Sequence, residues 1–248
     1  MFSYYLTMPG NLEGYLTENL YRLLEISEES KKVNYLSYLA VGHITSNCRE
    51  TLLNWVLDLS SNLNISVSTG LLACSYIDRF LSSRPNFQHS VLELVGITAL
   101  SLAMKFAEGK ILTPNSIYTM LDYRFSIDAI VTTELFILKE LEWNLSIPSP
   151  CELIDCLIEY SFDYPCTGRI IEFCHSFAVL CYLDTETVAS GNFNLAIASI
   201  VLSLDHLAYN ELRTDWLLSL KESFVFDSEK LEITVKRVLS KLNLFQKQ

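Results

Sequence analysis

Helix-start signals recur along this chain and divide it into short apolar segments. Each signal is a small polar residue with a glutamate three positions later, followed by an apolar run. This pattern is a capping box, in which the two side chains bond the free N–H groups at the start of a helix. The signals therefore predict a chain built from helices. Three such pairs are Asn47 with Glu50, Ser90 with Glu93, and Ser149 with Glu152.

The spacing of apolar residues predicts ten helices in two groups of five. Eight glycines and six prolines in 248 residues are about half the usual share. So few turn formers leave little room for a many-stranded sheet, and the fold class is predicted to be all-α. The first group is predicted at 48–63, 67–82, 90–108, 114–121 and 126–142, and the second at 150–161, 168–183, 192–208, 214–224 and 228–244.

The third helix of each group is apolar around its whole circumference, which is typical of a central helix enclosed by its neighbours. Between the groups lies Ser146–Pro150, which holds the only closely spaced proline pair. We therefore expect two similarly built domains in tandem, at 45–146 and 147–248. They would follow an N-terminal extension, 1–44, that carries an extra helix.

The charge balance argues against several classes of partner. Lysine and arginine number 18 against 29 aspartates and glutamates, so the net charge is −11. A chain with this charge binds nucleic acid or an anionic membrane weakly, since binding to either needs cationic side chains on the protein. The most apolar window, Leu195–Leu204, is about half a membrane span. We expect no nucleic-acid or membrane partner.

Seven cysteines form no CxxC pair, and their odd number indicates reduced core thiols of an intracellular protein, in the nucleus or the cytoplasm. No basic region precedes an apolar stretch at the start of the chain, so no signal peptide is expected. The cysteines are Cys48, Cys74, Cys151, Cys156, Cys166, Cys174 and Cys181.

Local signatures of catalysis are absent from the sequence. There is no GxxxxGK[ST], GxGxxG or GxSxG, and the four histidines form neither HxxxH nor HExxH. We predict no catalytic residue, no metal site and no cofactor. The histidines are His43, His89, His175 and His206.

Four charged residues lie in apolar helices. Arg49 and Asp78 are either surface charges or a buried bridge between the first two helices, since burying one alone is costly. Lys105 ends an apolar helix and Glu134 opens another, so the helix dipole also favours a cation at the first position and an acid at the second. The residues alone do not decide between these alternatives.

Four segments of the first group resemble the cyclin box, in order and at its spacing. Cys48-Arg-Glu-Thr-Leu52 with Trp55 and Asp58 resembles Met-Arg-x-Ile-Leu and its following tryptophan and acid. Tyr76-Ile-Asp-Arg-Phe-Leu81 is nearly the family consensus, and Ala103-Met-Lys-Phe106 is similar to Ala-Ser-Lys-Phe. The fourth segment, around Glu134, continues into Glu142-Trp-Asn-Leu145. That region and Asn19–Glu29 look most like D-type cyclins and the D-type-like cyclins of gammaherpesviruses.

The resemblance implies two tandem cyclin folds and a non-catalytic subunit that binds and activates a cyclin-dependent kinase as a heterodimer, promoting cell-cycle progression. It assigns Lys105 and Glu134 to a polar pair that contacts the kinase, and Arg49 with Asp78 to a structural salt bridge. A large apolar partner face would also account for the half of the residues that are hydrophobic. The resemblance assigns the apolar kinase contacts to Phe106, Leu138, Trp143 and Leu145.

The resemblance further implies a groove on the first helix that docks Arg-x-Leu segments of substrates or inhibitors. Cys48 stands for methionine and Thr51 for isoleucine, so the groove floor is smaller and more polar. The lost apolar burial is on the order of 1–2 kcal/mol, or about ten-fold in affinity. Glu93 is alternatively the capping partner of Ser90. The groove positions are Cys48, Thr51, Leu52, Trp55, Asp58, Leu92 and Glu93.

Some features of cellular D-type cyclins are missing. No Leu-x-Cys-x-Glu lies near the N-terminus, and no acidic Pro/Ser/Thr-rich tail follows Leu242, which fits a long-lived viral cyclin in a host cell. Two other hypotheses stay open: a cyclin-fold transcription factor, and a helical adaptor that binds peptides without a kinase. The sequence does not identify the kinase, its need for phosphorylation or its sensitivity to inhibitors.

Overall fold

The computed structural model describes residues 18–27, 36–41, 44–84, 88–161 and 167–245, and every regular element in them is helical. Residues 18–27 form a helix, and the 3-10 turns η1 (Ser37–Val41) and η2 (His89–Val91) precede α2 and α4. We call α2–α6 the first helix group. Its members are α2 (Ser46–Asn62), α3 (Val67–Ser83), α4 (Leu92–Ala107), α5 (Pro114–Met120) and α6 (Ile127–Glu140).

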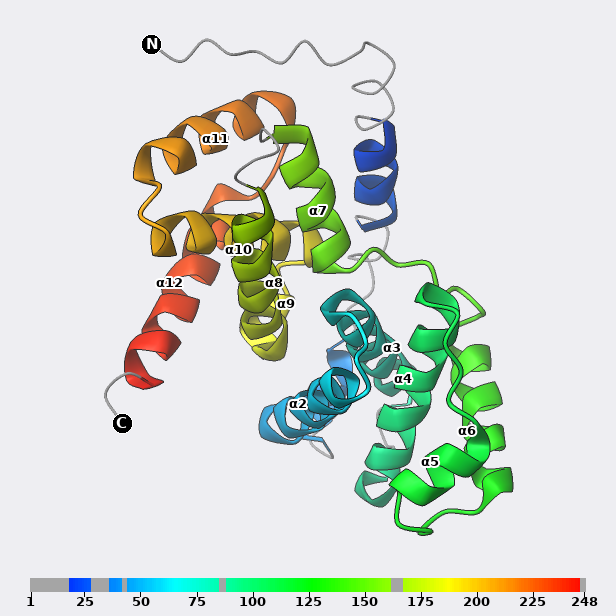
Figure 1. Ribbon diagram of the computed structural model, residues 1–248. Coiled ribbons are helices and arrows are strands. Elements are labelled where there is room, and N and C mark those ends of the chain that lie inside the picture. The colour runs from blue at the N-terminus through cyan, green and yellow to red at the C-terminus, as the bar shows by residue number, and fades with distance from the viewer. Residues whose placement is uncertain (1–17, 28–35, 42–43, 85–87, 162–166, 246–248) are drawn as a thin grey trace.

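The second helix group, α7–α12, lies beside the first (Figure 1). All ten predicted helices are present, so the all-α prediction is confirmed. The sequence did not predict α9, a single four-residue turn in which Asp184 accepts hydrogen bonds from the N–H groups of Glu186 and Thr187. The group comprises α7 (Pro150–Ser161), α8 (Thr167–Leu183), α9 (Thr185–Val188), α10 (Asn192–His206), α11 (Asn210–Ser223) and α12 (Ser228–Phe245).

Of the three predicted capping boxes, one is correct. The Ser149 N–H donates to Glu152 Oε2 at 2.7 Å, and the Glu152 N–H donates to Ser149 Oγ at 3.2 Å. The box at Asn47 is wrong because Thr45 caps α2 instead, accepting from the Cys48 N–H. The box at Ser90 is wrong because a 3-10 turn continues into α4, which begins without a side-chain cap.

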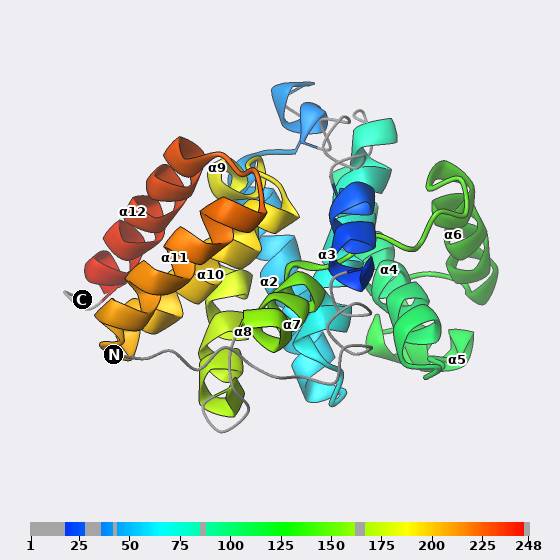
Figure 2. The ribbon, with the colours of Figure 1, turned by 90° about the horizontal axis from the view of Figure 1, so that it is seen from above.

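The two central helices are α4 and α10, as their apolar sequences predict. In each, the side chains are buried over three full turns, and neighbouring helices cover them from several sides (Figure 2). Within the described residues, one helical stretch, His89–Ala107, has the length and composition of a membrane span. Because 67 % of an 18-residue window within that stretch is buried inside the protein, its apolar character is accounted for by the core.

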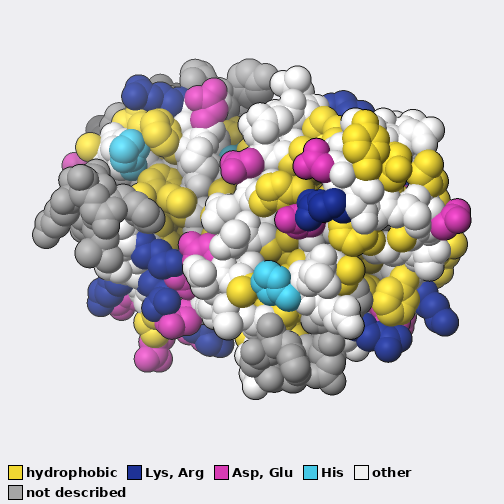
Figure 3. Space-filling model, turned by 90° about the horizontal axis from the view of Figure 1, so that it is seen from below, with side chains coloured by type: hydrophobic (Ala, Val, Ile, Leu, Met, Phe, Trp, Pro, Cys, Tyr) yellow, Lys and Arg dark blue, Asp and Glu magenta, His cyan; other side chains and the backbone are white. Residues whose placement is uncertain are grey.

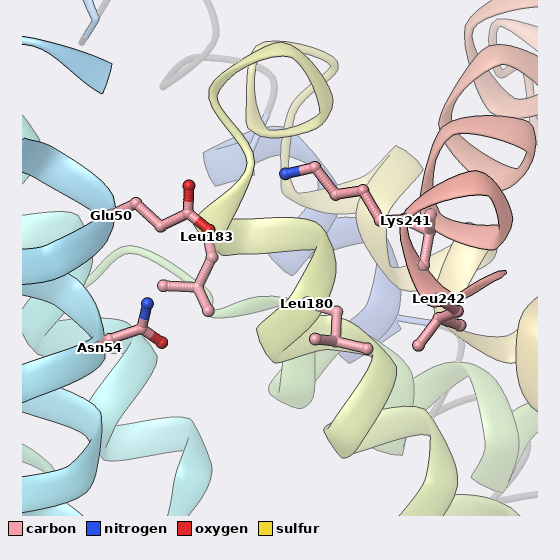
Figure 4. A pocket seen from close by; sticks show the side chains of 7 residues that line it. Glu50, Asn54, Leu180, Leu183, Lys241 and Leu242 are labelled. Atoms are coloured by element: carbon pink, nitrogen blue, oxygen red, sulfur yellow. The ribbon is translucent and has the colours of Figure 1, made fainter. Parts of the chain in front are cut away.

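The two groups meet where α2 and α3 lie against α7 and α8. A pocket of about 330 Å³ opens at this junction, between α2, α8 and α12. Figure 4 shows Glu50 and Asn54 on one wall and Leu180 with Leu183 on the facing wall. Elsewhere at the junction, the Tyr76 hydroxyl donates to the Leu145 carbonyl at 2.9 Å and fixes the connecting segment to α3.

Candidate functional site

A lysine–glutamate pair joins α4 to α6 at the surface. Lys105 Nζ lies 2.7 Å from both carboxylate oxygens of Glu134. The side chains are 33 % and 25 % exposed, so each has polar capacity left for another molecule. Lys105 lies in the last turn of α4, where the helix dipole favours a cation. The pair is thus a neutral polar feature on a helical face.

Exposed apolar side chains lie on the same two helices as this pair and in the turn that follows α6. Phe106 is 51 % exposed and Trp143 is 67 % exposed, whereas the predicted contact Leu138 is in the core and Leu145 is half-buried against it. The sequence analysis missed three more exposed apolar residues of α6, although the helical spacing of four could have indicated them. We call the set the α4–α6 face: Lys105, Phe106, Ile127, Val131, Glu134, Leu135 and Trp143.

The turn after α6 fixes the position of Trp143. Glu142 and Trp143 adopt left-handed backbone angles, with φ of 53° and 57°. The Trp143 N–H donates to the Leu138 carbonyl at 2.9 Å, and Arg79 Nη1 donates to the Asn144 carbonyl at 2.7 Å. Two consecutive left-handed residues are costly, so the neighbouring contacts must hold them. The indole is therefore presented to solvent from a fixed backbone.

The expected bridge between Arg49 and Asp78 is formed in the interior. Arg49 Nε and Nη2 donate to the two Asp78 oxygens at 2.8 and 2.7 Å, and both side chains are buried. Burial opposes the charge on Arg49, but the Asp78 carboxylate outweighs it and raises the pKa of the guanidinium. Burial and Asp78 likewise raise the pKa of Tyr38, whose hydroxyl donates to Asp78 Oδ1.

The sequence did not predict the other partners of Arg49. Nη1 donates to the Leu183 carbonyl at 2.8 Å and Nη2 to the Tyr182 carbonyl at 3.2 Å, both at the end of α8. One buried side chain of the first helix group thus binds the C-terminal end of a helix in the second. Every residue has a backbone carbonyl, so no residue pattern in the sequence could have indicated which carbonyls accept from Arg49.

A groove of about 590 Å³ lies between α2 and the start of α4, and we call it the α2–α4 groove. Six of the seven predicted groove residues line it, and Asp58 is exposed outside that lining. Apolar and isolated charged side chains mix on the face that carries α5 and the start of α4 (Figure 3). The lining residues are Asn47, Cys48, Thr51, Leu52, Trp55, His89, Ser90, Leu92, Glu93 and Arg124.

Two features of the groove do not follow from the sequence analysis. Glu93 does not cap α4 but forms an ion pair with Arg124, a residue that the sequence analysis did not select. Gly96 lets α4 approach α2 closely, since an added Cβ would lie 3.0 Å from the Trp55 ring and 3.2 Å from Leu52 Cδ1. Charge and close packing therefore both shape the groove.

The described cysteines are all free thiols, and four of the six are buried. Cys48 lines the α2–α4 groove, and Thr45 Oγ1 donates to its sulfur at 3.1 Å. The Thr45 hydroxyl and His89 lower the pKa of the Cys48 thiol. Cys166 and His43 lie outside the described residues.

An exposed apolar face around an ion pair, together with a lined groove, is typical of a protein that binds other proteins. The cyclin N-terminal domain model matches residues 19–146, which is more than half of the chain. The chain therefore belongs to the cyclin family.

Curated relatives come from plants, fungi and animals. Cyclin-B1-1 of Oryza sativa subsp. japonica is 26 % identical over 223 residues, covering 88 % of this chain and 49 % of the relative. G2/mitotic-specific cyclin-4 of Candida albicans is 32 % identical, covering 62 % and 31 %. G1/S-specific cyclin-D1 of Xenopus laevis is 27 % identical, covering 66 % and 56 %. The chain thus spans about half or less of the length of these relatives.

Solved structures show the same fold. A viral cyclin from herpesvirus saimiri superimposes with a TM-score of 0.74 at 14 % identity, covering 94 % of this chain and 96 % of that one. A chain of the CAK complex from Chaetomium thermophilum matches with a TM-score of 0.51 at 14 % identity, covering 90 % and 74 %. At this identity the likeness concerns the fold alone.

Proposed function

We propose that this chain is a non-catalytic regulatory subunit that binds a cyclin-dependent kinase and activates it. The observation that carries the proposal is the α4–α6 face. There the Lys105–Glu134 pair is partly exposed, and so are Phe106 and Trp143. The sequence resemblance assigns all four positions to kinase contacts. Membership of the cyclin family supports the same activity.

The chemistry of the face suits a backbone partner. The Lys105 ammonium can donate to a carbonyl of the kinase while the Glu134 carboxylate accepts from an N–H group. Because the pair is already formed, little side-chain ordering remains to be done on binding. A face that fits the active kinase better than the inactive one shifts the kinase population by that difference in binding free energy.

Several finer features belong to the proposal. We place the N-terminal extension at 1–44, the cyclin box at 45–146 and the second cyclin-fold domain at 147–248, in an intracellular protein. A viral origin is supported by a solved viral cyclin of the same fold and nearly the same length. The two rival functions, transcription factor and kinase-free adaptor, are outcomes of the experiment below.

We further propose that the α2–α4 groove docks short peptide segments of substrates or inhibitors. Its volume of about 590 Å³ is within the range of ligand sites. Leu52, Trp55 and Leu92 provide apolar surface in the lining, and Thr51 and Cys48 provide hydrogen-bonding groups.

The test is co-purification from an extract of dividing cells, with the kinase identified by mass spectrometry and then assayed on histone or pocket-protein substrates. We expect a stoichiometric active kinase with the wild type and loss of most kinase with the double variant Lys105→Ala plus Glu134→Ala. The matched control is Lys236→Ala plus Glu232→Ala, which removes another surface pair, on α12.

The outcomes separate the hypotheses. Full kinase binding by the Lys105/Glu134 variant contradicts the assigned face but not the activity. A captured kinase without phosphorylation indicates an adaptor, and capture of transcription proteins in place of a kinase indicates the transcription-factor alternative.

A further inference from the structure

The pocket between α2, α8 and α12 lies apart from the α4–α6 face and the α2–α4 groove. It shares no lining residue with the groove, and none of its lining residues belongs to the face. Its volume of about 330 Å³ is at the lower end of the range for sites that bind small molecules, and its walls come from both helix groups. Neither kinase binding nor peptide docking accounts for this pocket.

The second helix group supplies the apolar part of the pocket wall. Leu183 and Val238 are buried members of the core, whereas Leu180 is 37 % exposed. Such a wall stabilises an apolar ligand group by removing it from water. The four apolar lining residues are Leu180, Leu183, Val238 and Leu242.

Contacts of the neighbouring residues fix the walls of the pocket. Arg49, which precedes Glu50 on α2, donates to the Leu183 carbonyl at 2.8 Å and so joins α2 to the end of α8. Asp184, which follows Leu183, bonds Lys241 Nζ at 2.5 Å and so joins α12 to the same end of α8. The walls are therefore in place before a ligand binds, and little ordering remains to be done on binding.

The charges around the pocket leave one carboxylate without a counter-ion. Glu50 is half-buried, and no described residue forms an ion pair or hydrogen bond with its carboxylate. Lys241, by contrast, is paired with Asp184. Arg237 bonds both Asp184 and Glu186. These two cations balance these two acids, so the net charge of the cluster is that of Glu50.

The free carboxylate favours a cationic ligand. Figure 4 shows the Glu50 and Asn54 side chains projecting from α2 toward α8, one helical turn apart. A cation can bind Glu50 without displacing a partner, whereas an anion must compete with Asp184 for Lys241. The Asn54 amide adds a hydrogen-bond donor and an acceptor on the same wall.

We propose that this pocket binds a small molecule that has an apolar body and one cationic nitrogen. The body packs against Leu180, Leu183 and Val238, and the nitrogen donates to the Glu50 carboxylate. Because the walls belong to α2, α8 and α12, the bound molecule contacts both helix groups. Binding to the folded chain alone therefore stabilises the junction between them.

Ligand-observed NMR titration of the full chain with three probes tests this proposal. Phenylbutylammonium, phenylbutanol and phenylbutanoate share one apolar body and differ in the charge of the head group. We expect the wild type to bind the ammonium about five-fold more tightly than the alcohol, the size of one partly exposed charge pair. The carboxylate should bind most weakly. Saturating ammonium should also raise the urea midpoint of the wild type.

Three variants identify the source of the effect. Glu50→Gln keeps the size of the side chain and removes its charge, so the ammonium and the alcohol should then bind equally. Asp58→Asn is the matched control, because it removes another carboxylate of α2 outside the pocket lining, and should leave the preference unchanged. Leu180→Ala removes a partly exposed part of the apolar wall and should weaken all three probes to a similar extent.

Four outcomes would overturn the proposal. Equal wild-type affinities for the ammonium and the alcohol would remove the role of Glu50. Tightest binding of the carboxylate would make Lys241 the recognising charge. Absence of binding by every probe, or binding that neither Glu50→Gln nor Leu180→Ala changes, would exclude the pocket as the site. An affinity that falls as the protein concentration rises would mean that a second copy of the chain occupies the pocket.

Discussion

At the scale of single residues, Arg49 is among the largest fully buried side chains of the described residues. It is fully buried, and each of its three nitrogens donates a hydrogen bond to Asp78 or to the end of α8. A buried charge is tolerated only when its partners are complete. Removing one partner therefore lowers the free energy of unfolding by more than the intact pair contributes to it.

The variant Asp78→Asn should lower the free energy of unfolding by about 3–5 kcal/mol, because it leaves the Arg49 charge uncompensated in the interior. Urea denaturation followed by circular dichroism measures this change. Glu232→Gln, in the exposed pair with Lys236, is the control and should cost less than about 1 kcal/mol. Similar values for the two variants would contradict the buried-charge account.

The thiol of Cys48 should be the most reactive of the described cysteines. Its pKa is lowered by Thr45 and His89, whereas burial raises the pKa of Cys156 to about 11 and those of Cys174 and Cys181 to about 12. Only the thiolate is nucleophilic, so a lower pKa means more reactive thiol near pH 7. Its labelling rate should fall as pH is lowered.

The measurement is timed alkylation at pH 7 with peptide mapping, comparing Cys48 with the buried Cys74 and Cys151. Thr45→Val, which removes the hydroxyl that bonds the sulfur, should slow the labelling of Cys48 alone. Faster labelling of either buried cysteine would overturn the prediction.

At the scale of helices, the sequence predicts that a helix exists more accurately than it predicts the residue at which the helix begins. Apolar periodicity located all ten helices, because a helix must bury one face and its apolar residues therefore recur at helical spacing along the sequence. The starts at α2 and α4 were wrong because several polar residues precede each helix, and tertiary packing decides which one becomes the cap. The four-residue α9 is too short to carry a period.

Gly96 and Gly168 are two helical glycines with opposite expectations. A Cβ at Gly96 would meet three side chains of α2 at 3.0–3.2 Å, whereas nothing lies within 4 Å of one at Gly168. Gly96→Ala should destabilise the protein by about 1–3 kcal/mol through overpacking. Gly168→Ala should stabilise it by up to about 1 kcal/mol, the ordinary gain in a helix.

Thermal unfolding of both variants, with peptide binding to the α2–α4 groove as a second measurement, tests this pair. Gly96→Ala should also weaken groove binding, because the added methyl group displaces Trp55 or Leu52. If Gly96→Ala changed neither the stability nor the peptide binding, α2 and α4 would be able to move apart without loss of free energy of unfolding, which would contradict the overpacking prediction.

Asp184 links α9 to α12 and gives the fold an acid-sensitive point. It accepts from Arg237 Nε at 2.9 Å and from Lys241 Nζ at 2.5 Å while capping α9. Burial raises its pKa, but Lys241, Arg237 and the N–H groups outweigh this and lower the pKa from 3.8 to about 2. Asp184 thus stabilises the fold above pH 4, and this contribution is lost as pH falls toward 2.

Asp184→Asn should therefore lose stability at pH 7 and show a flatter decline between pH 4 and pH 2 than the wild type. Chemical denaturation at a series of pH values measures the two slopes. Parallel curves for the two proteins would mean that other carboxylates account for the acid sensitivity in this range.

At the scale of the whole molecule, the candidate sites were predicted unevenly. Lys105, Glu134 and six groove residues follow from a resemblance that aligns positions along the sequence. Arg124 does not follow from the resemblance. It lies in a turn 31 residues after Glu93, and helical spacing does not predict that the two side chains meet. The contact of Arg49 with α8 crosses 134 residues and ends on a carbonyl, so it needed the folded chain.

Contacts across the junction predict that the two helix groups unfold together. Besides Arg49, the Ser68 and Ser149 hydroxyls lie 2.8 Å apart across it. Trp55 in the first group and the buried Trp216 in the second can report on each group separately.

The experiment uses two variants, Trp143→Phe with Trp216→Phe and Trp55→Phe with Trp143→Phe, each of which leaves one reporter. In each variant, fluorescence and circular dichroism should give the same urea midpoint, since both helix groups share one transition. Adding Arg49→Met removes the buried donor that binds both Asp78 and the end of α8, and should separate the fluorescence midpoint from the circular dichroism midpoint. Separate midpoints before that change would mean that the junction does not couple the groups; a single transition after it would assign the coupling to the remaining contacts between α3, α7 and α8.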